Sequence, residues 1–218
     1  MSSNVKEAIL TRHSSRLYLP KPVPRALLDK ALELARQSPS DTNTQIWRTF
    51  IVTGAALSTL KTELTARARM DDEPNIPGPP AEFAGYRSKL GALLYGVGWG
   101  IPRDDRARRR EAVLRNFDFF GAPVAVIVCM SRELPGKAAL SVGMYMQTLM
   151  LALTEMGLQS CAMISTTGYP DVVKRAVGIP ENLDVLCGMS IGYEDVDAGV
   201  NWVRAEREPV DKTTVWVE

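Results

Sequence analysis

Leu140–Gly157, with the sequence LSVGMYMQTLMLALTEMG, is the stretch that decides the fold of this chain. It predicts one long helix, and its leucine and methionine side chains fall on nearly every side of that helix. A helix on a protein surface is apolar along one face only. We therefore expect this helix either at the centre of the core or along the seam of a dimer.

Shorter elements flank this helix in the sequence. Apolar and β-branched runs predict strands at Trp47–Thr53, Val124–Cys129, Leu158–Ile164 and Val185–Ile191, with a β-prone tail at Thr213–Val217. Helical periodicity predicts helices at Asn4–Arg12, Pro24–Gln37, Ala55–Arg69 and Asp171–Val177. Several connections are short or irregular. The expected fold class is therefore α+β, a sandwich with a mostly antiparallel central sheet and helices around it, rather than a doubly wound parallel sheet.

The length of 218 residues fits a single domain, residues 1–218. One segment, from about 70 to 110, differs from the rest of the chain. Prolines and acidic residues between Asp71 and Pro80 break regular structure, a helix from Phe83 to Leu94 is expected next, and Tyr95–Gly100 is expected to end it. We expect a lid-like excursion that lines or covers a pocket; a plain surface insertion is the alternative.

Composition excludes several classes of protein. The formal net charge of +1 gives no reason to expect nucleic acid or an acidic membrane surface as a partner, and no apolar run approaches the roughly 18 residues of a membrane span. Three widely spaced cysteines and a polar start without a secretory signal indicate a cytoplasmic protein. His13 is the only histidine, which excludes a histidine-built metal centre. If the chain is an enzyme, we expect a cofactor to supply the difficult chemistry.

Two segments carry groups suited to a phosphorylated heterocycle. Arg12–Arg16, with the sequence RHSSR, offers two guanidiniums and two hydroxyls, which suit a phosphate dianion. His13 within it is a candidate phosphate ligand, or equally an N–H donor to its own backbone. Ser38–Trp47, with the sequence SPSDTNTQIW, follows one amphipathic helix later and is dense in hydroxyl and carboxamide groups. Neither segment is a general feature of globular proteins, so finding both in this order and at this separation favours a protein that binds a phosphorylated heterocycle.

Three further motifs have simpler explanations when each is taken alone. Met163–Pro170 follows a predicted strand and offers hydroxyls and backbone N–H groups to a ligand, although it could be an ordinary turn. Gly96–Gly100 lacks the spacing, the preceding strand and the downstream acid of a dinucleotide fingerprint. The arginine run Arg103–Arg115 is interrupted by acidic residues and lacks an aromatic pattern, so a solvated helix face is favoured over nucleic-acid binding.

Taken in order, these motifs make the chain resemble the FMN-dependent nitroreductase family over nearly its whole length. The matching segments are Arg12–Arg16, Pro22–Pro24, Ser38–Trp47, Ala122–Pro123, the methionine-rich helix, Met156–Cys161, Ser190–Tyr193 and Arg207–Asp211. Ile46 departs from the pattern, because family members commonly carry proline before the tryptophan. The resemblance implies an intertwined homodimer, joined through the long central helix and exchanged termini, with two FMN sites in the interface.

The resemblance also implies roles for particular residues. The implied FMN-binding residues of one chain are Arg12, His13, Ser14 and Arg16, then Ser165, Thr166 and Thr167 beside N5 of the flavin, and Arg207 at the phosphate. Ser40 and Asn43 would reach the flavin from the partner subunit. Arg204 is spaced differently from the basic pair of some family members. The candidates for an aromatic wall over the flavin are Phe83, Tyr86, Tyr95 and Trp99.

The implied reaction needs no catalytic side chain and no metal, because the chemistry takes place at N5 of FMN. In a ping-pong mechanism NAD(P)H gives a hydride to FMN and leaves, and a nitroaromatic or quinone acceptor takes its place. Two alternatives remain: a flavin-dependent reductive dehalogenase on the same scaffold, with Thr167 at N5, and a flavin-binding protein without turnover. No residue pattern distinguishes NADH from NADPH.

Overall fold

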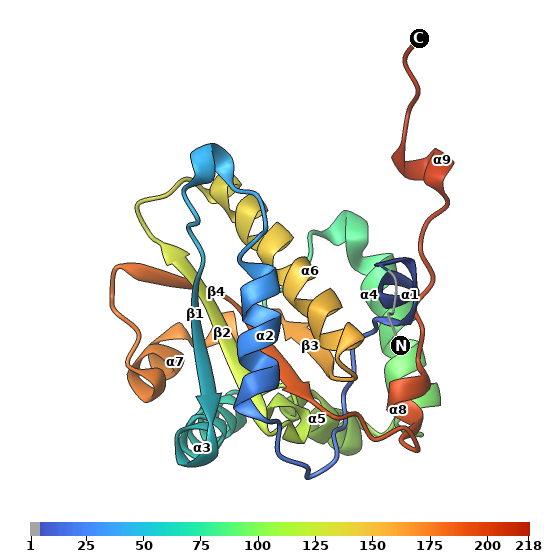
Figure 1. Ribbon diagram of the computed structural model, residues 1–218. Coiled ribbons are helices and arrows are strands. Elements are labelled where there is room, and N and C mark those ends of the chain that lie inside the picture. The colour runs from blue at the N-terminus through green and yellow to red at the C-terminus, as the bar shows by residue number, and fades with distance from the viewer. Residues whose placement is uncertain (1–4) are drawn as a thin grey trace.

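The centre of the protein is a four-stranded antiparallel sheet, seen in a computed structural model of which residues 5–218 are described (Figure 1). The strands are β1 (Arg48–Thr53), β2 (Val124–Ser131), β3 (Gln159–Met163) and β4 (Leu183–Gly192). They lie in the order β1-β2-β4-β3, and every neighbouring pair is antiparallel. The predicted α+β class and the antiparallel central sheet are confirmed.

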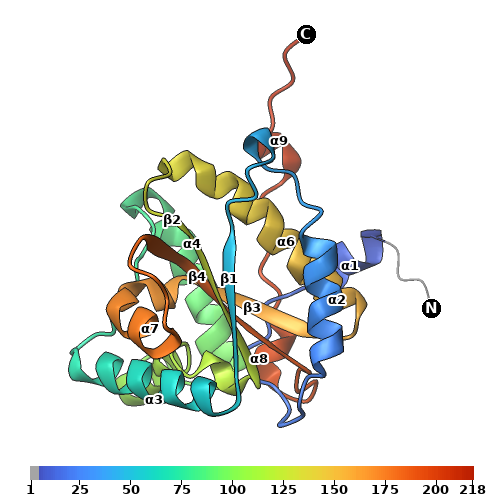
Figure 2. The same cartoon turned by 60° about the vertical axis from the view of Figure 1, so that its left-hand side comes forward.

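Helices cover both faces of the sheet. The helices of eight or more residues are α2 (Arg25–Ala35), α3 (Gly54–Met70), α4 (Ala84–Gly91), α5 (Arg106–Leu114), α6 (Ala139–Glu155) and α7 (Pro170–Val177). The shorter ones are α1 (Val5–Thr11), α8 (Gly199–Trp202) and α9 (Val210–Thr213). Figure 2 shows α2 and α6 on one face of the sheet, and α3 and α7 on the other. Asn4, which the sequence places in the first helix, lies outside the described residues.

Strand β2 separates the two halves of the core. Its side chains alternate, so the even-numbered ones from Val124 to Val128 pack with α2 and α6, and the odd-numbered ones from Ala125 to Cys129 pack with α3 and α7. All of these side chains are buried. An unbroken apolar run is what a strand covered on both faces requires.

Helix α6 is the long helix that the sequence predicts. Val142, Tyr145, Leu149 and Leu153 are buried against the sheet, and the ring of Tyr145 stacks on Trp47 with 4.8 Å between the ring centroids. Its methionines are only half-buried within one chain. The helix is therefore part of the core on one side and leaves apolar surface on the other.

The helix that the sequence predicts from Phe83 ends inside Tyr95–Gly100, as expected, although its last part, Ala92–Gly98, is π-helical. Gly98 allows close packing there, because a Cβ on it would lie 3.0 Å from the Cα of Val200 in α8. The β-prone tail Thr213–Val217 contains no strand, since it begins in α9 and then runs away from the body with no strand beside it (Figure 1).

The tail leaves large apolar side chains in solvent. Val215, Trp216 and Val217 are 84%, 85% and 92% exposed.

Among residues 5–218, no helix combines the length and apolar character needed to cross a bilayer.

Candidate functional site

The segment Arg12–Arg16 lies along the outer edge of β3. Ser14 forms a parallel bridge with Ser160, and the backbone N–H of Ser15 donates to the Ser160 carbonyl at 3.2 Å. Further on, Tyr18 is buried, and its hydroxyl contacts the Ser15 carbonyl at 2.9 Å and Ser190 Oγ at 2.8 Å. The predicted phosphate segment is therefore held by a sheet edge and an anchored tyrosine.

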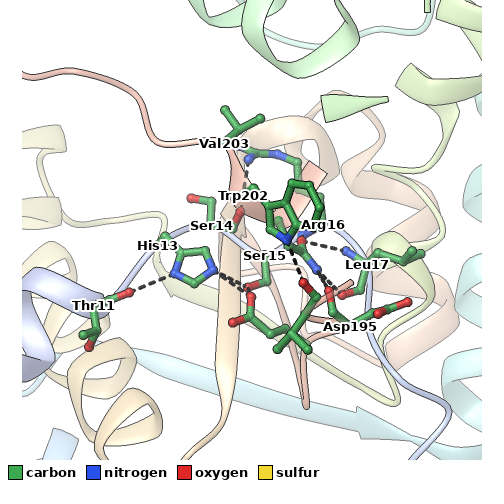
Figure 3. A network of polar contacts seen from close by, with 12 residues as sticks. Thr11, His13, Ser14, Ser15, Arg16, Leu17, Asp195, Trp202 and Val203 are labelled. Carbon is green, nitrogen blue, oxygen red and sulfur yellow. Dashed lines mark hydrogen bonds and ion pairs between the residues drawn. The ribbon is translucent and has the colours of Figure 1, made fainter. Parts of the chain in front are cut away.

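A hydrogen-bond network ties this segment to the chain after β4 (Figure 3). His13 Nε2 lies 2.7 Å from a carboxylate oxygen of Glu194, and the Ser15 hydroxyl donates to the same oxygen at 2.8 Å. The Asn201 side chain accepts from the backbone N–H of Arg16 at 2.7 Å and donates to the Leu17 carbonyl at 2.7 Å. Residues almost 200 positions apart in sequence thus form one structural unit.

Arginines from the two ends of the chain come close to one another. Burial, followed by the positive charge of Arg207, lowers the pKa of Arg12. Arg16, Arg204 and Arg207 donate to backbone carbonyls, and none of these four arginines takes part in the ion pairs found within residues 5–218. Neighbouring guanidiniums without carboxylate partners make a site suited to a phosphate dianion.

The threonine-rich loop directly follows β3 as the 3-10 segment Ile164–Gly168. Ser165 and Thr166 are buried, and the Thr167 hydroxyl donates to the Ile164 carbonyl at 2.8 Å. Ser165 Oγ is buried without a hydrogen-bond partner in the described part of the chain. Buried hydroxyls are nearly always hydrogen-bonded, so a free one beside this edge of the sheet suits a polar ligand.

Ser40 and Asn43 lie elsewhere in the same chain. Their loop is at the N-terminal end of α6, where the backbone N–H of Asp41 faces Ser141 Oγ at 3.4 Å (Figure 1). Thr42, Asn43 and Gln45 all have positive φ, between 46° and 57°. Such a conformation is costly for residues other than glycine and is often retained at binding sites. Their contact with FMN across a dimer stays a prediction.

The four aromatic candidates have different neighbours. Phe83 and Tyr86 lie near each other, and the Tyr86 hydroxyl donates to Glu208 at 2.9 Å. Tyr95 lies beneath the Arg109 guanidinium, and Trp99 packs against an arginine of the same basic run. Burial raises the pKa of Tyr95, and the charges of Arg109, Arg87 and Arg16 oppose that rise, that of Arg109 most. The place of the four candidates against the flavin stays a prediction.

Asn75 and Asp71 hold the threonine-rich loop, a role that the sequence did not predict for them. The side-chain amide of Asn75 donates to the Gly168 carbonyl at 2.9 Å, and its backbone N–H donates to the Tyr169 hydroxyl at 2.7 Å. That hydroxyl in turn donates to Asp71 at 2.7 Å. The start of the 70–110 segment is therefore fastened to the loop. Glu194 and Asn201 were missed as well; the position of Glu194 directly after the Ser190–Tyr193 motif is the signal that marks it.

Comparison with known proteins agrees with this architecture. The family model described as "Nitroreductase family" matches residues 9–193. The 4-nitrobenzoate reductase of Pseudomonas putida is 33% identical over 212 residues, which cover 95% of this chain and 93% of that protein. The FMN and NADPH-dependent nitroreductase NfnB from Sphigopyxis sp. strain HMH superposes with a TM-score of 0.94 at 31% identity, covering 99% of this chain and 100% of that one. The FMN-dependent NfnB from Mycobacterium smegmatis, solved with NADPH, gives a TM-score of 0.89 at 32% identity over 98% and 97% of the two chains. The chain therefore belongs to the nitroreductase family.

Proposed function

We propose that this protein is an FMN-dependent nitroreductase that takes a hydride from NAD(P)H and reduces nitroaromatic or quinone acceptors. The observation that carries the proposal is that Arg12 and Arg207, from opposite ends of the chain, lie close enough for their charges to interact and form no ion pair within residues 5–218. Arg16 and Arg204 flank them, because the backbone N–H of Arg16 and the Arg204 guanidinium both donate to Asn201. The relatives support the same activity, because they include a 4-nitrobenzoate reductase and two FMN-dependent nitroreductases.

The residues present fit FMN. The arginines would hold its phosphate, and the free hydroxyl of buried Ser165 would find its missing partner on the flavin. When bound, FMN supplies hydride and electron transfer between NAD(P)H and the acceptor. The protein's own part is to orient the two reactants in turn, so no side chain has to act as acid or base.

Individual side chains would contribute through charge and position. Arg16, held by the Ser14 carbonyl at 3.1 Å, would stabilise negative charge on the pyrimidine edge of the flavin. Thr166 and Thr167 would lie beside N5. We also propose that the 70–110 segment lines the acceptor pocket, with Tyr95 as its residue nearest to the flavin site.

We further propose that the protein is an intertwined homodimer. β1 pairs with a strand on one side only, since it stands at the end of the sheet among residues 5–218. A groove lies beside it, with an apolar part lined by Val23, Leu28, Leu32, Ile51 and Leu57 and charged side chains such as Lys21 and Asp29 around that part. The apolar tail Val215–Val217 of one chain is suited to cover such a groove on the partner. Light scattering after gel filtration tests this, and a monomer at micromolar concentration would contradict it.

The cellular location follows from the thiols and the reductant. Cys129, Cys161 and Cys187 are free cysteines, which suits a reducing compartment, and NAD(P)H is supplied in the cytoplasm. We propose that the enzyme works there.

Two measurements test the proposed activity. Purified protein should carry FMN absorbance and should oxidise NADPH or NADH when 4-nitrobenzoate or a benzoquinone is added. Arg207→Ala should lose FMN on gel filtration while its far-UV circular dichroism stays unchanged. A protein that binds FMN but oxidises neither nucleotide would be a flavin-binding protein without turnover. Turnover of halogenated but not nitro acceptors would favour the dehalogenase alternative.

A further inference from the structure

The contact between His13 and Glu194 is the least exposed pairing of a basic with an acidic side chain among residues 5–218. The two side chains are 8% and 19% exposed, and His13 Nε2 lies 2.7 Å from the carboxylate. On the other side of the ring, Nδ1 lies 2.8 Å from the Thr11 carbonyl. Figure 3 shows the His13 ring with Thr11 on one side of it. Both of its nitrogens are occupied within the chain.

The chemistry of the two partners defines what the ring does. A carbonyl and a carboxylate both accept hydrogen bonds, and the protonated ring donates from both nitrogens at once. In either neutral tautomer, one ring nitrogen carries no hydrogen, and that nitrogen would face an acceptor with no hydrogen bond between them. The two contacts therefore occupy both ring nitrogens, which leaves neither of them free to donate to a phosphate oxygen.

The position of Glu194 connects the two groups of arginines. Glu194 follows β4, lies close enough to Arg204 for their charges to interact, and accepts from Ser15 inside the Arg12–Arg16 segment. Asn201 joins the same two segments through backbone groups. The carboxylate thus lies between arginines that come from opposite ends of the chain.

We infer that Glu194, together with His13, is a positioning residue that fixes the Arg12–Arg16 segment relative to Arg204 and Arg207, and that the His13 ring itself is not a phosphate ligand. This inference rests on the proposed function, because it concerns how the site is arranged to bind the phosphate of FMN. It changes the role expected for His13 from direct contact to support.

Simple electrostatics and positioning predict opposite effects of removing this carboxylate. If Glu194 acted on the phosphate only through its charge, its loss would tighten the binding of a dianion. If it positions the arginines, its loss would misalign charge-assisted hydrogen bonds and weaken that binding. The sign of the change therefore distinguishes the two roles.

The experiment compares FMN with riboflavin, which is the same flavin without the phosphate. Dissociation constants are measured by flavin fluorescence for the wild type, Glu194→Gln and Asp184→Asn. Asp184 is the matched control, because it lies near the other end of β4 and pairs with Arg132 at 3.1 Å on the exposed surface. The quantity compared between the three proteins is the FMN preference, defined as the dissociation constant of riboflavin divided by the dissociation constant of FMN.

We expect the wild type to prefer FMN, Glu194→Gln to lose that preference by roughly ten- to hundredfold, and Asp184→Asn to keep it. Riboflavin affinity should fall less than FMN affinity in Glu194→Gln, because riboflavin has no phosphate and would lose only part of its contact with Arg16. A preference that is unchanged or stronger in Glu194→Gln would overturn the inference and leave the proposed function intact. A wild type that binds FMN no better than riboflavin would overturn both.

A milder variant covers the case in which Glu194→Gln fails to fold. Ser15→Ala removes only the hydroxyl that donates to Glu194 at 2.8 Å. It should reduce the FMN preference in the same direction and by a smaller factor. Full retention of the preference in a folded Ser15→Ala protein would count against positioning by this network.

Discussion

Replacing Gly168 by alanine tests how tightly the 70–110 segment holds the threonine-rich loop. A Cβ on Gly168 would lie 1.8 Å from the carbonyl oxygen of Asn75 and 2.9 Å from its carbonyl carbon. Ordinary contact begins near 3.4 Å, so the two backbones would have to separate by about 1.6 Å. No flexible side chain can absorb this movement, because the obstacle is main chain.

The expected cost follows from what that separation breaks. Overpacking of this kind costs about 1–3 kcal/mol. The movement also strains two hydrogen bonds of Asn75, to the Gly168 carbonyl at 2.9 Å and to the Tyr169 hydroxyl at 2.7 Å, each worth about 1 kcal/mol. We expect Gly168→Ala to lower the free energy of unfolding by about 2–5 kcal/mol.

The assay is urea denaturation followed by tryptophan fluorescence, with Gly136→Ala as the matched control. Gly136 has nothing within 4 Å of its Cβ position, and neither glycine has a positive φ. Both variants lower the entropy of the unfolded chain alike, so their difference isolates the clash. The reasoning is refuted if Gly168→Ala unfolds within about 0.5 kcal/mol of the control.

Three further predictions concern other parts of the molecule. Burial raises the pKa of Cys129 and of Cys187 to about 11. A thiol reagent at about pH 8 should therefore react quickly with three thiols in urea and slowly with the native protein. A thiol that reacts quickly in the native protein would contradict this. Burial alone would raise the pKa of Glu194, but hydrogen bonds from its histidine and serine partners hold that pKa below its ordinary value. The stabilising contribution of the ionised carboxylate is therefore present above pH 4.5 and lost as the pH falls through the lowered pKa. In urea titrations, the difference in free energy of unfolding between the wild type and Glu194→Gln should shrink towards acid pH. A difference that grows towards acid pH would contradict this reasoning. Gly98→Ala should lower the free energy of unfolding by about 1–3 kcal/mol in the same titrations, because the new Cβ meets the backbone of α8. Gly96→Ala is the control and should cost nothing measurable, because the space around Gly96 is open. Equal effects of the two substitutions would argue against close packing at Gly98.

The elements of the core could be predicted from sequence because their patterns are physical requirements. The unbroken apolar run of β2 fits a strand that is covered on both faces, and the periodic helices α2 and α3 each bury one face. Local propensity failed where a distant neighbour decides the structure. Gly98 leaves room for the backbone of α8, a contact that no local pattern reveals, and the β-prone tail has no neighbouring strand among residues 5–218.

The site could be predicted in part for a similar reason. Arg12–Arg16 and Ser165–Thr167 offer charged or hydroxyl groups within a short local motif, so the sequence marks them directly as candidates. Glu194 and Asn75 act through contacts with residues 181 and 93 positions away, and no local pattern reveals such contacts. The predicted FMN contacts of Ser40 and Asn43 would be made by a second copy of the chain, so they remain a prediction.

The tie between His13 and Glu194 has a consequence for synthesis on the ribosome. The Arg12–Arg16 segment is synthesised well before the side chains that hold it, because Glu194 lies 181 residues after His13 and Asn201 lies 185 residues after Arg16. All four strands of the sheet are therefore made before this segment can be fixed in place. Loading of FMN at the proposed site would then have to follow the synthesis of these two residues.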